Sequence, residues 1–188
     1  IRCLCASHPA PLIDSKEGWV LPVRSVGVQG DSRTYRHALA LEALPNEGMI
    51  RSLAPALTNG RSDINRVVAV CGVNAPLGSL KLFEAYLTKE RLDLLLQCDA
   101  IVRKFCADTG FESQVWQFPV VLLPIGTPRA RDSVVLRPVG PIDGMTAEAE
   151  LMHEAILHSL TATLLAIAGI SAVFYDVTNK PPGTIEWE

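Results

Sequence analysis

The chain closes with residue types that could bind a charged ligand: Asp-Val-Thr-Asn-Lys-Pro-Pro-Gly-Thr-Ile-Glu-Trp-Glu over residues 176–188. Its two prolines fix two φ angles, and the glycine after them lets the chain reverse, so we expect a stiff segment. Lys180 and Glu186 then lie at fixed places on it. A cation and a carboxylate presented together suit a ligand with a phosphate at one end and N–H donors at the other. The alternative is a segment that merely docks on the protein through Trp187.

A second candidate lies in residues 26–35, which read Val-Gly-Val-Gln-Gly-Asp-Ser-Arg-Thr-Tyr. Gly27, Gly30 and Asp31 bracket a turn that exposes Arg33. Backbone N–H groups of a glycine-flanked turn can approach an anion, and the guanidinium adds planar donors at the same place. Because Gly-Asp turns are common, a solvated arginine on an ordinary turn is the alternative.

Gln117 is a polar residue in an otherwise apolar stretch, between Trp116 and Phe118. We expect a strand over residues 115–123. In that strand Gln117 is either edge-facing and solvated, or a donor and acceptor for the edge of a base. Its neighbours favour neither alternative.

The histidines and cysteines do not form a recognisable catalytic or metal-binding pattern. His153 and His158 are five residues apart, so they would not stack on one helix face, and we expect all four histidines to be structural or solvated. A single Cys-x-Cys pair, Cys3 and Cys5, has no second pair, so no metal site is predicted. The other three cysteines fall in apolar segments and fit small core residues.

Composition predicts a globular chain without a general affinity for nucleic acid or membrane. Of 188 residues, 48% are hydrophobic and 20% charged, with a net charge of −3. The apolar stretch at residues 164–175 is shorter than the ~18–20 residues of a membrane-spanning helix. We read the thiols as reduced and expect a cytoplasmic location.

The elements that must position these residues repeat along the chain. Pro-Asn-Glu-Gly at 45–48 and Pro-Ile-Asp-Gly at 141–144 are each followed by Met, and apolar segments surround both in the same order. We predict an α+β fold with two copies of a small β-β-α-β unit, in mixed sheets packed by helices. The expected strands are 20–29, 35–44 (with helix as a rival), 64–71, 115–123, 133–138 and 172–177. The expected helices are 49–57, 90–106, and a long one capped by Thr146 and closed by Gly169.

Three parts follow from this order. Residues 1–16 are predicted to be a connector from a preceding domain. Residues 17–112 form a first α/β subdomain with a helical insertion, and residues 113–188 form a second subdomain that carries the closing segment.

Three segments together resemble GMP synthases, the glutamine-hydrolysing enzymes that aminate xanthosine monophosphate (XMP). Residues 176–188 resemble that family's C-terminus, residues 26–35 resemble its Val-Gly-Val-Gln-Gly-Asp-x-Arg-x-Tyr element, and Gly-Met-Thr at 144–146 resembles a third element. Their order and spacing are similar to those of the long form, whose C-terminal region carries two copies of a small α/β unit. The resemblance covers residues 17–188 and is weakest in the middle.

The resemblance implies a set of residues that bind XMP: Asp31, Arg33, Gln117, Lys180, Thr184, Ile185 and Glu186. It implies that Lys180 serves the 5′-phosphate and that Glu186 accepts N–H donors of the xanthine ring. Because guanine and adenine present other donor and acceptor patterns, this carboxylate would also select the base.

The resemblance also implies what the chain leaves to other domains. Neither the Ser-Gly-Gly-Val-Asp-Ser loop of the ATP pyrophosphatase domain nor the Gly-x-Cys-x-Gly turn of the glutaminase domain occurs. ATP and Mg²⁺ would therefore serve the full enzyme, with none bound by this fragment, which alone should be inactive. An assembly module that forms a homodimer is the second hypothesis, and a small-molecule regulatory domain is the third.

Overall fold

The computed structural model describes residues 10–29, 32–44, 46–140 and 147–187. A seven-stranded sheet runs through the molecule in the order β2-β3-β4-β5-β10-β9-β7. Its strands are β2 (Ile13–Ser15), β3 (Gly18–Gln29), β4 (Ser32–Leu41), β5 (Ile64–Val73), β7 (Val120–Leu123), β9 (Asp132–Leu136) and β10 (Ile170–Asp176). A small second sheet pairs β1 (Ala10–Pro11), β6 (Lys81–Leu82) and β8 (Ile125–Gly126). The α-helices are α1 (Glu47–Gly60), α2 (Lys89–Thr109) and α3 (Glu154–Leu165), with short 3-10 turns η1 (Leu77–Ser79) and η2 (Phe111–Ser113).

The same β-β-α-β order occurs twice and confirms the predicted α+β class. In the first unit β3 and β4 are antiparallel, and α1 leads to β5, which is parallel to β4. In the second unit β7 and β9 are antiparallel, and α3 leads to β10, which is parallel to β9. The two units meet through the antiparallel pair β5 and β10, so they share one continuous sheet. The boundary at residue 112 remains a prediction.

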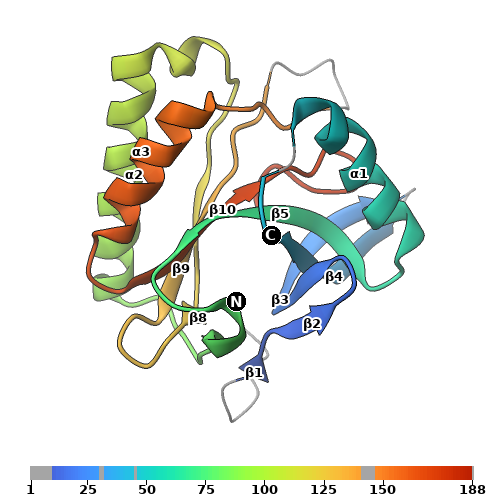
Figure 1. The fold of residues 1–188 in the computed structure, drawn as a ribbon, viewed down its shortest axis with the longest axis horizontal. Helices are drawn as coiled ribbons and strands as arrows, with labels where there is room; N and C mark the ends of the chain where they lie inside the picture. Colours follow the sequence, from blue (N-terminus) through green and yellow to red (C-terminus); the bar gives the residue numbers. More distant parts are fainter. Residues whose placement is uncertain (1–9, 30–31, 45, 141–146, 188) are drawn as a thin grey trace.

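The large sheet separates two cores, because its strands alternate side chains between two faces. One face is covered by the helices: α2 and α3 lie side by side over one part of the sheet, and α1 lies over the other (Figure 1). The other face packs against the small sheet and against Trp187 near the end of the chain. The side chain of Trp187 therefore lies on the face opposite the helices.

The last helix begins later than predicted. Thr146, expected as its N-cap, lies outside the described residues. The residues after it are not helical: Ala147 forms a β-bridge with Lys180, and Ala149 forms one with Val139. The helix starts at Glu154, after the side chain of His153 accepts a hydrogen bond from the Ala155 amide. The prediction was wrong because backbone pairing with a segment 33 positions away competes with the helix, and Lys180 N donates to Ala147 O at 2.7 Å.

One further strand prediction needs correction, and another is confirmed with shifted bounds. The strand expected over 115–123 begins only at Val120; Pro119 has no N–H to donate to a ladder, and Gln117 forms an isolated bridge to Val139 instead. The segment expected at 35–44 is a strand rather than a helix, and it runs from Ser32 to Leu41.

The three described cysteines are reduced and sit in apolar surroundings. Cys98 and Cys106 are buried in the helix-side core and Cys71 packs against it. Burial raises the pKa of the Cys71 thiol to about 12 and those of Cys98 and Cys106 to about 11. These thiols therefore remain protonated at neutral pH and are not activated nucleophiles. Within the described ranges there is also no group of three or more His, Cys, Asp or Glu placed to hold a metal ion. None of the described helices is long and apolar enough to cross a membrane.

Candidate functional site

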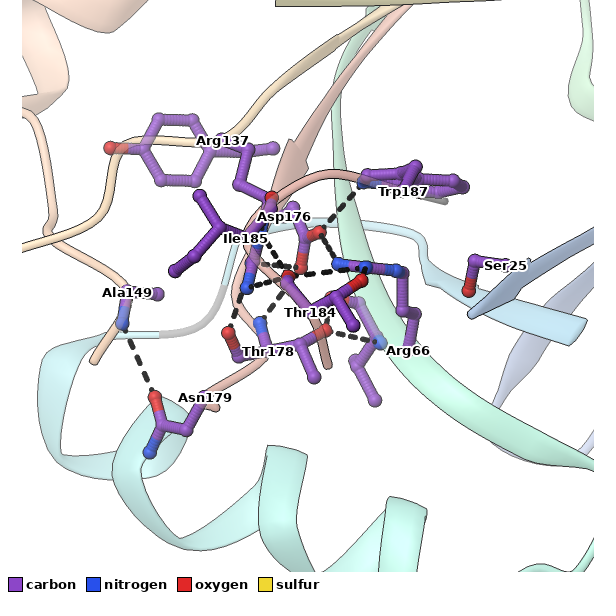
Figure 2. Close-up of polar contacts among 12 residues, drawn as sticks. Ser25, Arg66, Arg137, Ala149, Asp176, Thr178, Asn179, Thr184, Ile185 and Trp187 are labelled. Carbon is purple, nitrogen blue, oxygen red and sulfur yellow. Dashed lines mark hydrogen bonds and ion pairs between the residues drawn. The ribbon is translucent and has the colours of Figure 1, made fainter. Parts of the chain in front are cut away.

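Three buried charged residues meet at one end of the central strands. Arg66 lies near the start of β5, Arg137 directly follows β9, and Asp176 ends β10. Their side chains are 0%, 1% and 0% exposed, respectively. Nη1 of Arg66 lies 2.9 Å from Oδ2 of Asp176, and Nη1 of Arg137 lies 3.0 Å from Oδ1 of the same carboxylate (Figure 2). We refer to these three residues as the charged cluster.

Residues 177–187, here called the tail, cross over the charged cluster and then run along β3. The amide of Val28 donates to Pro182 O at 2.7 Å, and the amide of Val26 donates to Trp187 O at 3.2 Å. Between them Gly27 forms an antiparallel bridge with Gly183. A Cβ atom on Gly27 would lie 2.9 Å from Pro182 O, so this close approach of the two backbones requires glycine.

Main-chain carbonyls of the tail point into the charged cluster. Arg137 donates from Nε to Ile185 O at 2.8 Å, from Nη2 to Thr184 O at 2.8 Å and from Nη1 to Thr178 O at 3.0 Å. Arg66 donates from Nη2 to Glu186 O at 2.8 Å and to Thr184 Oγ1 at 2.7 Å. The tail backbone thus supplies most of the acceptors for these two guanidinium groups (Figure 2), although Nε of Arg66 has no hydrogen-bond partner among the described residues.

Trp187 anchors the end of the tail. Its side chain packs in the core on the small-sheet face, and the residue is 8% exposed. The indole Nε1 donates to Oδ2 of Asp176 at 2.9 Å, and the ring lies 5.0 Å from the guanidinium carbon of Arg66. The tail therefore does dock through Trp187, as the alternative from the sequence proposed.

Burial and mutual attraction act in opposite directions on these charges. Burial lowers the pKa of Arg66 to about 10, although Asp176 nearby favours its charged form. Burial alone would raise the pKa of Asp176, but Arg137, Arg66 and hydrogen bonds from Thr178 outweigh it and hold that pKa below its usual value. The carboxylate is therefore ionised at neutral pH, and two cations share one anion.

The sequence-predicted tail residues take different orientations. Thr184 directs its hydroxyl inward, donating to Val26 O at 3.2 Å, and Ile185 is buried against Val139 and Ala147. Glu186 is exposed, and Lys180 is half-buried with its backbone paired to Ala147. Of these tail residues, Glu186 and Lys180 have side chains that are at least partly accessible to solvent.

Arg33 lies on the β3–β4 hairpin that the tail runs along, whereas Gln117 lies elsewhere. Arg33 is exposed on β4 directly opposite Val28, the residue whose amide bonds to the tail. Asp31 lies outside the described residues. Gln117 borders a separate hollow of about 400 Å³ next to Trp116. Its backbone pairs with Val139, which pairs with Ala149, and Ala147 in turn pairs with Lys180 of the tail.

An open hollow of about 680 Å³ lies beside the tail and the β3–β4 hairpin. Its wall includes Val28 and Arg36 from the hairpin, Arg61 after α1, and Pro181 and Pro182 from the tail. Arg61 pairs with Asp63 at 2.8 Å, which raises the pKa of Arg61. The hollow is in the size range of small-molecule sites, and its basic residues favour an anionic ligand.

Sequence analysis missed the charged cluster, although the sequence contains one sign of it. Arg66, Arg137 and Asp176 each stand at the end of a strongly apolar strand segment. Charged residues are rarely buried unless they are paired, so three of them at such positions predict a buried ion pair.

Comparison with known proteins links the chain to GMP synthases. Residues 104–187 match the family model described as GMP synthase C terminal domain. A probable glutamine-hydrolysing GMP synthase of Leptospira interrogans is 38% identical over 177 residues, which cover 93% of this chain and 29% of that protein. The probable GMP synthase of Caenorhabditis elegans is 34% identical over 197 residues, which cover 90% of this chain and 26% of that protein.

A third relative, the GMP synthase of Chlorobaculum tepidum, is 31% identical over 183 residues, which cover 88% of this chain and 36% of that protein. The chain thus spans between 26% and 36% of the length of these three relatives. The matched family model takes in the end of α2, the second β-β-α-β unit and the tail. The resemblance found in the sequence is confirmed, and the chain belongs with the C-terminal parts of glutamine-hydrolysing GMP synthases.

Proposed function

We propose that this chain binds XMP as the substrate-holding part of a GMP synthase and presents it for ATP-dependent amination to GMP. The observation that carries the proposal is the tail: its backbone is fixed by buried groups, while the carboxylate of Glu186 remains exposed. A fixed acceptor at the surface can select a base that offers N–H donors. Xanthine offers them on its pyrimidine ring, as the resemblance implies.

The remaining contacts would come from the tail and the β3–β4 hairpin. Lys180 supplies a compact positive charge for the 5′-phosphate, and Arg33 adds a guanidinium opposite Val28. The basic hollow beside Pro181 and Pro182 is in the size range for a nucleoside monophosphate, whereas Glu186 borders a different hollow next to α2 and β7. Asp31 and Gln117 remain proposed contacts by resemblance; Thr184 and Ile185 would act through their backbone, because their side chains point inward.

The chain's residues would contribute by position and charge, not as acid, base or nucleophile. In the proposed enzyme, ATP and Mg²⁺ activate the 2-oxygen of XMP in a pyrophosphatase domain, and a glutaminase domain supplies ammonia. Both domains are partners inferred from the family. The cytoplasmic location likewise remains a prediction.

Calorimetric titration of the chain with XMP, GMP and IMP tests the proposal. XMP should bind more tightly than the other two, and Glu186→Ala should weaken XMP binding about 10- to 100-fold, the usual effect of losing a hydrogen bond to a charged group. Glu112→Ala, an exposed glutamate on η2, serves as the matched control and should bind XMP as the wild type does. Absence of binding at millimolar XMP would count against the proposal for this chain.

An assembly module is the second candidate, and one observation bears on it. Strands β5 and β10 join the two β-β-α-β units within one chain. Single-copy members of the family are expected to pair two subunits through this domain, so a duplicated pair could replace that contact. Sedimentation at several concentrations tests this candidate: a tight dimer unaffected by XMP favours assembly as the main role.

A further inference from the structure

We propose that Arg66, Arg137 and Asp176 are positioning residues, which hold the backbone of the tail so that Glu186 and Lys180 meet the substrate at fixed places. This inference rests on the proposed XMP-binding function. None of the three side chains is exposed, so none can touch the substrate directly. They act through the tail.

The first argument is the match between donors and acceptors. Nε and Nη2 of Arg137 reach the carbonyls of two successive tail residues, Ile185 and Thr184, each at 2.8 Å. Nη2 of Arg66 reaches the next carbonyl, that of Glu186, also at 2.8 Å. Three consecutive peptide units are therefore held by two side chains, Arg66 from β5 and Arg137 just after β9. Figure 2 shows the bonds from Arg137. This arrangement fixes both the position and the rotation of the backbone around Ile185.

The second argument is the charge balance. Two buried guanidinium groups share one carboxylate, so the cluster carries a net positive charge. Carbonyl dipoles of the tail, directed at the guanidinium groups, offset that charge. If the tail left, the donors of Arg66 and Arg137 would lose these acceptors, and unpaired buried donors are strongly unfavourable. Docking of the tail and satisfaction of the charged cluster therefore depend on each other.

The third argument is the position of Glu186 relative to the charged cluster. Its carbonyl is bound by Arg66, whereas its side chain is exposed. The charged cluster thus places the Cα atom of Glu186 while its carboxylate, which attracts Arg66, stays exposed. At the start of the tail, Thr178 is held in two ways: its amide donates to Oδ1 of Asp176 at 2.9 Å, and its carbonyl accepts from Arg137. Thr178 lies two residues before Lys180, so these bonds also restrict the position of Lys180. A contact residue that is already in place loses less freedom on binding, which favours affinity.

The guanidinium shape is essential to this role. A lysine at position 137 would keep the positive charge and its attraction to Asp176. It could not donate in several fixed directions, because an ammonium lacks the planar fork. Arg137→Lys therefore separates charge from positioning. Arg24→Lys, an exposed arginine on β3, makes the same chemical change outside the charged cluster and is the matched control.

Hydrogen exchange provides a readout that does not depend on substrate. The amides of Val26 and Val28 donate to Trp187 O and Pro182 O, so their protection reports tail docking. In Arg137→Lys we expect exchange at these two amides to rise at least tenfold, while amides in β9 and β10 stay protected. XMP affinity, measured by calorimetry on the same sample, should fall at least tenfold. Arg24→Lys should match the wild type in both measurements.

Arg66→Lys provides a second variant if Arg137→Lys yields little folded protein. It keeps the charge but cannot reproduce the bonds from one guanidinium to Glu186 O and Thr184 Oγ1. The same two readouts apply, and the same tenfold changes are expected.

Wild-type exchange at Val26 and Val28 in a folded variant would overturn the inference, because the tail would then stay docked without the guanidinium fork. Faster exchange with unchanged XMP affinity would also overturn it, since docking would not matter for the substrate. A wild-type chain that does not bind XMP would overturn the proposed function and the substrate role of the charged cluster together. That outcome is seen before any variant is made and is therefore distinct from the other two.

Discussion

Asp176→Ala is expected to lower the free energy of unfolding by about 3–5 kcal/mol, the usual loss when one partner of a buried ion pair is removed. Asp176 is the carboxylate that both Arg66 and Arg137 share, and it also accepts the indole N–H of Trp187. Without it, two cations remain buried close together. The tail carbonyls can bind their N–H groups but cannot neutralise both charges.

Urea unfolding followed by circular dichroism measures this loss. Asp93→Ala is the control, because Asp93 and Lys89 form an ion pair whose side chains are 57% and 82% exposed; removing that carboxylate should change stability by less than about 1 kcal/mol. Asp176→Asn keeps the side-chain volume and removes the charge, so it should reproduce most of the loss. An asparagine variant as stable as the wild type would contradict the charge argument.

The fold was predictable because local patterns and the global arrangement agree. Runs of β-branched and aromatic residues in β5, β9 and β10 favour strands, and α2 is capped by Thr88 and ends at Gly110, around the helix expected at 90–106. The repeated Pro-x-x-Gly-Met element predicts two consecutive units with the same order of strands and helix. The joining of the two units through β5 and β10 could not be read from either segment, because both are apolar on both faces and could pair with several neighbours.

The start of α3 shows why an apolar period can mislead. Leu151 falls within the long helix expected from residue 146 onward, yet it precedes α3, which begins at Glu154. The amide of Met152 donates to the hydroxyl of Tyr175, and the carbonyl of Glu150 accepts from the same hydroxyl. These bonds to Tyr175 on β10 hold residues 150–152 in an extended conformation. They join residues far apart in sequence, so a local pattern of apolar residues does not predict them.

The candidate site was predicted in part. Residue types singled out the tail and the β3–β4 hairpin, and the structure places these two segments against each other although about 150 residues separate them. Their binding of a ligand remains a proposal. The inward turn of Thr184 and Ile185 was not predictable, because it depends on Arg66 and Val139, which lie far away in sequence. The charged cluster joins positions 66, 137 and 176 in the same way.

Trp187→Ala is the other substitution expected to have a large effect, with a loss of about 3–5 kcal/mol that is typical of truncating a buried tryptophan. The ring fills space in the core between the two sheets, faces Arg66 and donates to Asp176. Because Trp187 lies at the end of the tail, the loss should appear first as undocking of that segment. Hydrogen exchange at Val26, whose amide donates to Trp187 O, measures undocking, and urea unfolding measures the total loss.

Trp187→Phe divides the tryptophan's contribution into packing and hydrogen bonding. Phenylalanine keeps an aromatic face towards Arg66 but removes the donor to Asp176, so the expected loss is about 1.5–3 kcal/mol, the range for a hydrogen bond to a charged group. Trp116→Ala, at a position that is 53% exposed, should cost only about 0.5 kcal/mol and controls for the loss of an indole. A phenylalanine variant equal to the wild type would mean that apolar packing alone docks the tail. Asp176 would then serve the two arginines only, and the indole N–H would add nothing to the charged cluster.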